Sequence, residues 1–126
     1  MRAIDANVLL RLITRDDPRQ TASAESFIEN GAWVSVLVLA EATWVLSTVY
    51  ELSPSNLAIA IEMLLNHQQM VLQDQDAVAS ALELFRARPG LGFSDCLMLH
   101  MAKKAGHLPL GTFDRDLARA HDAQRL

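Results

Sequence analysis

The chain has 126 residues, of which 51% are hydrophobic and 21% charged, and this composition excludes a disordered protein. The length predicts one domain over residues 1–126, long enough to bury a core. A formal net charge of −4 argues against a protein that binds polyanions through its overall charge. A single cysteine, Cys96, excludes an intrachain disulfide, and the N-terminus has no signal-peptide layout, so we expect a cytoplasmic protein.

Short strands and longer helices are predicted to alternate along the chain. Strands are predicted at residues 3–4, 32–35, 69–73, 108–113 and, as a terminal edge strand, 123–126. Helices are predicted from Val8 onward and then over residues 18–29, 36–50, 54–65, 74–88, 94–105 and 114–120. Because parallel strands need such crossover helices, the predicted fold class is α/β, a three-layer α/β/α sandwich with a central, mostly parallel sheet of four to five strands.

One stretch, from Trp33 to Val49, is apolar enough to raise the question of a membrane helix. Glu41 lies in its middle, where insertion into a bilayer would cost roughly 2.5–3.5 kcal/mol. A buried helix of a soluble protein explains the stretch better, so we expect no contact with a membrane. An isolated buried carboxylate is itself unfavourable, so Glu41 is expected to be paired, hydrogen-bonded or bound to a cation.

Three further carboxylates stand where solubility alone does not explain them. Asp5 and Asp114 each follow a predicted strand, and Asp95 opens a predicted helix behind the capping residue Ser94. Helix capping is the alternative explanation for these three, and an exposed helix face is the alternative for Glu41. Together, however, the four acids are predicted to lie at the carboxyl edge of a parallel sheet, which is where ligands bind in such folds.

Four like charges at one edge would repel one another, and a hard divalent cation with oxygen ligands removes that repulsion. Mg²⁺ or Mn²⁺ suits carboxylate ligands, and such an ion supports the hydrolysis of phosphodiesters by activating water and neutralising charge at phosphorus. Asn7, Ser35 and Thr112 are short polar residues that could orient the ligands or the water. Phosphate contacts are expected from basic residues on the same helices as the acids, namely Arg11, Arg15, Lys103 and Lys104.

Four short motifs carry a resemblance to a known family. They are Asp5-Ala-Asn7-Val-Leu-Leu, Val38-Leu-Ala-Glu41, Phe93-Ser-Asp95 before a helix, and Thr112-Phe-Asp114-Arg-Asp-Leu. In this order they resemble the PIN-domain ribonucleases, especially the VapC-type toxins of bacterial toxin–antitoxin pairs, over essentially the whole chain. The resemblance implies a Mg²⁺- or Mn²⁺-dependent endoribonuclease, usually a homodimer, that cleaves RNA and is neutralised by a small VapB-like antitoxin.

Carried over by position, the resemblance implies an acidic site of Asp5, Glu41, Asp95 and Asp114. Asn7 and Thr112 match the accessory polar positions of the family, and Asp116 could add a further ligand. Two alternatives remain open. A phosphatase of the aspartyl-phosphate type would need a second acid where this chain has Asn7, and a non-catalytic flavodoxin-like interaction module would need a lysine at a strand end.

Overall fold

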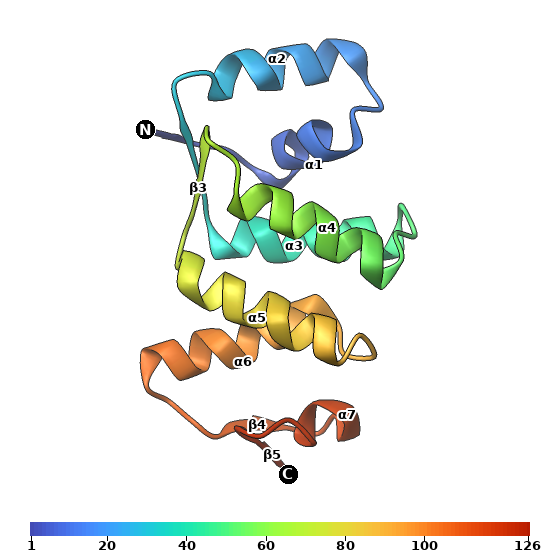
Figure 1. Ribbon diagram of the computed structural model, residues 1–126, viewed down its shortest axis with the longest axis vertical. Helices are drawn as coiled ribbons and strands as arrows, with labels where there is room; N and C mark the ends of the chain where they lie inside the picture. The colour runs from blue at the N-terminus through green and yellow to red at the C-terminus, as the bar shows by residue number, and fades with distance from the viewer. The chain divides into compact units, whose positions relative to one another are not determined.

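One or two helices separate each strand from the next in a computed structural model that describes residues 1–126 (Figure 1). The packing divides the chain into two units: unit 1 comprises Met1–Gln75 and unit 2 comprises Asp76–Leu126. No helix of the chain has both the length and the apolar composition that a membrane span requires.

Unit 1 contains three strands and four helices. In chain order these are β1 (Arg2–Ala3), α1 (Ala6–Thr14), α2 (Pro18–Ile28), β2 (Ala32–Val34), α3 (Val36–Thr48), α4 (Pro54–Leu65) and β3 (Met70–Leu72). Each helix begins at a short polar side chain that accepts a main-chain N–H of the first turn, which is the usual way of satisfying an N-terminal donor. These N-caps are Asp5, Asp17, Ser35 and Ser53. The predicted helix starts at Pro18 and Pro54 are therefore confirmed.

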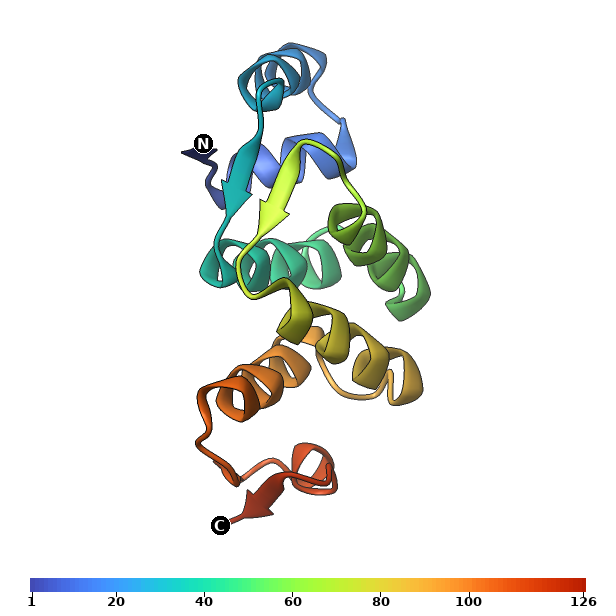
Figure 2. The same ribbon diagram turned by 60° about the vertical axis from the view of Figure 1, so that its left-hand side comes forward.

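The three strands of unit 1 form a parallel sheet in the order β1-β2-β3. Trp33 on the central strand lies opposite Ala3 on one neighbour and Val71 on the other, and Figure 2 shows β2 and β3 side by side. The carboxyl ends of the strands are aligned as well, because Ile4 N–H donates to the Trp33 carbonyl at 3.2 Å and Gln73 N–H donates to the Val34 carbonyl at 2.9 Å. The residues that follow the strands therefore gather at one edge.

The core of unit 1 lies between its helices and one face of the sheet. Its most deeply buried large side chains are Leu9, Val34, Leu39, Leu46 and Ile61. They come from α1, β2, α3 and α4, so each of these elements contributes its apolar stripe to one core. In this unit α1 packs against α2 and α3, and α4 packs against α3 and β3.

Unit 2 contains the remaining elements. They are α5 (Gln75–Ala87, which starts at the last residue of unit 1), α6 (Phe93–Ala105), β4 (Leu110–Thr112), α7 (Arg115–Ala118) and β5 (Ala123–Arg125). The rings of Phe85 and Phe93 meet edge to face, with centroids 5.8 Å apart. β4 and β5 pair in parallel, which confirms the predicted terminal strand.

The α/β class and the parallel pairing are confirmed, with two differences in detail. The five strands form one sheet of three strands and one of two, where the sequence predicts a single sheet of four to five. The predicted Ser94 cap of α6 is wrong, because the helix begins at Phe93 and its N-cap is Gly92. Gly92 supplies its carbonyl, which accepts the N–H groups of Asp95 at 3.1 Å and of Cys96 at 3.2 Å.

Candidate active site

Asp5 is the residue that joins the end of β1 to the start of α1. Its Oδ1 accepts the Val8 N–H at 3.0 Å, so the carboxylate is held by the main chain of the helix that it begins. Its other oxygen, Oδ2, has no hydrogen-bond donor in the protein, and the residue is exposed. One oxygen of a fixed carboxylate is therefore open to a cation. Asn7, in the first turn of α1, is exposed beside it.

Glu41 lies on the solvent face of α3, so its predicted burial among apolar neighbours is wrong. The reason is the rotation of the helix: Leu39, Ala42, Thr43 and Leu46 face the core. Leu37 and Trp44, which are 78% and 60% exposed, share the opposite face with Glu41. The Glu41 carboxylate forms no ion pair or side-chain hydrogen bond, so it is free to bind a cation, although burial does not require one.

Two more polar side chains lie at the carboxyl edge of the unit 1 sheet. Ser35 Oγ accepts the Val38 N–H at 3.1 Å and so caps α3. Gln73, which follows β3, accepts the Val36 N–H through its Oε1 at 2.9 Å and thereby joins the end of β3 to the start of α3. The sequence did not single out Gln73. Its only signal was a polar residue at the end of a predicted strand, which is common in loops of every kind.

Asp95 and Asp114 are the two candidate carboxylates of unit 2. Asp95 lies half-buried in the first turn of α6, and burial, followed by the negative charge of Asp114, raises the pKa of its carboxyl above the ordinary value. Neither carboxylate has a basic side chain as an ion-pair partner. Two acids that influence each other without a counter-ion are the arrangement that a bound cation would stabilise.

Asp114 is held as firmly as Asp5. It caps the short helix α7, and its Oδ1 accepts the N–H groups of Asp116 at 2.8 Å and Leu117 at 3.1 Å. Thr112 Oγ1 accepts the Asp114 N–H at 3.0 Å and so fixes the turn that leaves β4. The Asp116 side chain is exposed and makes no such contact, although its carbonyl accepts Arg88 Nη2 at 3.3 Å.

The four basic residues predicted to contact phosphate all have acidic partners in the structure. Arg11 pairs with Asp16, Arg15 with Glu25 at 2.9 Å, Lys103 with Asp122 at 3.6 Å and Lys104 with Asp76 at 2.6 Å. Arg11 is the most constrained of them. Its guanidinium also contacts the Tyr50 hydroxyl at 3.2 Å and Gln20 Oε1 at 2.9 Å, and the Tyr50 contact is the main cause that raises the pKa of Arg11. Each of these cations would have to leave an acidic partner to bind phosphate.

The carboxylates are thus distributed as two sets. Asp5 and Glu41 belong to unit 1, and Asp95 and Asp114 belong to unit 2. Neither unit on its own gathers three or more His, Cys, Asp or Glu side chains that could hold a metal. The gathering of all four acids into one site stays a prediction.

Cys96 directly follows Asp95 but faces the core of unit 2. It is fully buried, and burial, followed by the charge of Asp95, raises the pKa of its thiol to about 11. A thiol of this kind stays protonated at neutral pH and is a poor nucleophile. Cysteine chemistry therefore has no place in the candidate site.

The chain is thus an α/β protein with carboxylate oxygens beyond the carboxyl ends of its parallel strands, the edge at which such proteins bind ligands. In a comparison with models of protein families, residues 3–123 match the PIN domain, so the chain belongs to the PIN domain family. PIN domains are in general metal-dependent nucleases and hence hydrolases. A search of curated proteins finds no match for the chain.

Proposed function

We propose that this protein is a Mg²⁺- or Mn²⁺-dependent endoribonuclease that uses Asp5, Glu41, Asp95 and Asp114. The observation that carries the proposal is the carboxylate pair of unit 2, in which burial and then the charge of Asp114 raise the pKa of Asp95 and no basic side chain compensates either charge. The PIN family assignment supports the same chemistry. RNA is proposed as the substrate because the sequence motifs resemble those of PIN-domain ribonucleases.

The donor set of unit 2 fits a hard cation. Mg²⁺ is usually held by one or two carboxylates together with waters and substrate phosphates, so a pair such as Asp95 and Asp114 is a sufficient protein contribution. An ion bound there would supply positive charge for the developing phosphorane and would lower the pKa of a bound water. No lysine or arginine forms an ion pair with Asp95 or Asp114, so no side chain of the protein already supplies the positive charge that a cation would bring.

The protein's own residues provide fixed geometry. Asp5 and Asp114 cannot turn freely, because each has an oxygen bonded to the main chain of the helix that it caps. Thr112 adds a hydroxyl that holds the Asp114 turn. Side chains held in this way need no rearrangement when substrate arrives, which favours rapid catalysis. Asn7 and Ser35 are proposed to assist at the unit 1 edge, and Asp116 to be a further ligand.

We further propose that the protein is the toxin of a VapBC-like pair, acting in the cytoplasm as a homodimer neutralised by a VapB-like antitoxin. The motif resemblance supports the toxin role. The exposed apolar residues on α3 and α4 support an interface, since exposed apolar patches often mark protein contacts. These residues are Leu37, Trp44, Ile59 and Met63. Light scattering on the purified protein tests the dimer, and neutralisation by a small protein encoded beside it tests the pair.

The decisive experiment measures cleavage of a fluorescent RNA by purified protein. Cleavage should stop with EDTA and return with Mg²⁺ or Mn²⁺. Asp95→Asn should reduce the rate by at least about 10- to 100-fold, the loss seen when even a partner of a metal ligand is removed. Glu83→Gln, which removes one exposed carboxylate of unit 2 from α5, is the matched control and should cleave normally. Undiminished cleavage by metal-free protein would contradict the proposal, and hydrolysis of a phosphomonoester alone would favour the phosphatase alternative.

A further inference from the structure

A hollow of about 480 Å³ begins at Asp5 and runs between α1 and α2 in unit 1. Asp5, Asn7 and Arg11 line it from the side of α1, and Arg19 and Gln20 line it from the side of α2. The open oxygen of Asp5, Oδ2, belongs to a residue of this wall. Whatever enters the hollow therefore comes next to a proposed site residue.

Of the two arginines in the hollow, only Arg19 is free to bind an anion. Arg11 is held by Asp16, by the Tyr50 hydroxyl and by Gln20 Oε1, so its charge is already compensated. Arg19 is exposed in the first turn of α2 and has neither an ion pair nor a side-chain hydrogen bond. Its charge makes the wall complementary to a phosphate.

A second hollow, of about 520 Å³, adjoins the first along α2. The two share Ser23 and Phe27, and the second is lined as well by Arg2 and Ser26. Arg2 lies over the Phe27 ring at 3.8 Å from its centroid and donates to the Phe27 carbonyl at 3.1 Å, but no acidic group pairs with it. The two hollows along α2 are thus lined by two uncompensated arginines, Arg19 of α2 and Arg2 of β1, and by serine side chains of α2.

We propose that these two hollows form one track for single-stranded RNA, which begins at Asp5 and uses Arg19 and Arg2 as contacts to backbone phosphates. The inference rests on the proposed nuclease function and adds to it the residues that hold the strand. Arginine suits this role because its planar guanidinium donates two parallel hydrogen bonds to a phosphate. Two side-chain amides, Asn7 and Gln20, line the track, and Gln20 is held there by Arg11, so we assign the contacts to the backbone and expect binding that is tolerant of sequence.

The test measures binding apart from cleavage. The affinity of wild-type protein for a short labelled single-stranded RNA is followed by fluorescence anisotropy in EDTA over a series of KCl concentrations. In Arg19→Gln, the slope of log affinity against log salt should fall by about 0.7, and affinity in about 0.1 M salt should fall about fivefold, as expected for one phosphate contact on a single strand. Arg19→Lys keeps the charge and should keep most of the slope. Arg2→Gln should lower the slope by a similar amount, provided that its melting temperature shows a folded protein.

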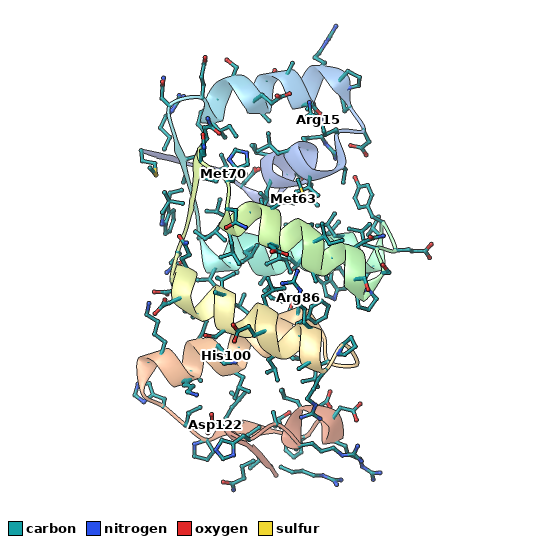
Figure 3. The ribbon with its side chains drawn as sticks, in the orientation of Figure 1. Arg15, Met63, Met70, Arg86, His100 and Asp122 are labelled. Atoms are coloured by element: carbon teal, nitrogen blue, oxygen red, sulfur yellow. The ribbon has the colours of Figure 1, made fainter.

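Arg15→Gln is the control variant. It distinguishes the track, which uses Arg19 and Arg2, from the prediction made from the sequence, in which Arg15 contacts phosphate. It removes the same charge from unit 1, but Arg15 is paired with Glu25 and lines a different cavity, of about 470 Å³, together with Met63 and Met70 (Figure 3). A loss confined to Arg19→Gln and Arg2→Gln supports the track. Equal losses in Arg15→Gln and Arg19→Gln, an unchanged slope in Arg19→Gln, or no binding of RNA by the wild type would overturn it. If the wild type cleaves RNA but the salt slope of Arg19→Gln is unchanged, the track is wrong and the nuclease proposal stands. If RNA binding depends on Arg19 but no metal-dependent cleavage occurs, the nuclease proposal is wrong and the track stands.

Discussion

Asp5 and Asp114 each carry two tasks in one side chain. Each begins a helix by accepting main-chain N–H groups, through Oδ1 in both cases. Each is also a candidate ligand for a cation, and a negative group at a helix N-terminus is favoured by the helix dipole. The capping role fixes where the carboxylate stands, so the structural task prepares the chemical one.

The two tasks of Asp5 can be separated by two substitutions. Asparagine caps a helix as well as aspartate does, so Asp5→Asn should lose RNA cleavage and keep its stability. Asp5→Ala should lose cleavage and also about 1 kcal/mol of stability, because the Val8 N–H then has no side-chain acceptor. Urea denaturation and the cleavage assay measure the two effects. Equal stability of the two variants would show that the cap contributes nothing.

Asp95 should reduce the stability of the metal-free protein. Its pKa is raised by burial and by Asp114, which means that folding disfavours its charged form at neutral pH. Asp95→Asn removes the charge and retains the shape, so the variant should melt at a higher temperature than the wild type in EDTA at pH 7 while losing activity. The gain should shrink when Mg²⁺ is added, because the ion stabilises only the wild type. A lower melting temperature in EDTA would contradict this.

At the scale of single elements, α3 shows how a nearly all-apolar helix can still have two faces. Leu39 and Leu46 are 1% exposed, whereas Leu37 is 78% exposed on the same helix. Glu41 marks the exposed face. Composition alone indicated burial all round, and only the packing of the helix against the rest of unit 1 reveals which side is covered.

Two leucines of α3 should therefore respond very differently to truncation. Leu46→Ala should destabilise the protein by about 2–5 kcal/mol, the usual result of emptying a buried leucine site. Leu37→Ala should change the free energy of unfolding by no more than about 0.5 kcal/mol, as for other exposed positions. Urea denaturation of the two variants at one protein concentration gives both values. A large loss of stability in Leu37→Ala would show that this face of α3 is covered in solution. The interface of the proposed homodimer would be one such cover.

Helix starts could be read from the sequence because their causes are local. Asp17 before Pro18 and Ser53 before Pro54 are capping signals that need no knowledge of the fold. The N-cap of α6 was missed because Gly92 caps with its carbonyl alone and leaves Ser94 inside the helix. The exposure of Glu41, the ion pairs of the basic residues and the contact of Gln73 depend on partners far away in the chain. Such contacts leave no local pattern.

At the scale of the whole molecule, the match to the PIN domain covers residues 3–123 and thus includes candidate carboxylates from both units. The uneven distribution of charge also has a structural outcome. Lysine and arginine are absent between Gln20 and Phe85, and four of those on either side, Arg11, Arg15, Lys103 and Lys104, pair with acids, whereas Arg2 and Arg19 do not. These pairs make stability depend on pH.

Acid should weaken these pairs. The pKa of Asp76 is lowered chiefly by Lys104, and that of Asp16 chiefly by the Thr14 hydroxyl, with Tyr50 and Arg11 also contributing. A carboxyl whose pKa is lower in the folded state stabilises the protein above its ordinary value of 3.8, and this stabilisation is lost as the pH falls through the lowered pKa. Asp76→Asn should therefore melt below the wild type at pH 6, and the difference should shrink progressively as the pH falls below 3.8. Circular dichroism melts across this range measure it, and a difference that persists in acid would contradict the assignment.

The buried Cys96 has a practical consequence. Because its thiol lies in the core of unit 2 and stays protonated, an alkylating reagent can reach it only when that core opens. The rate at which the reagent labels Cys96, followed by mass spectrometry, would report the opening of unit 2 under native conditions. No additional cysteine has to be introduced into the protein for this measurement.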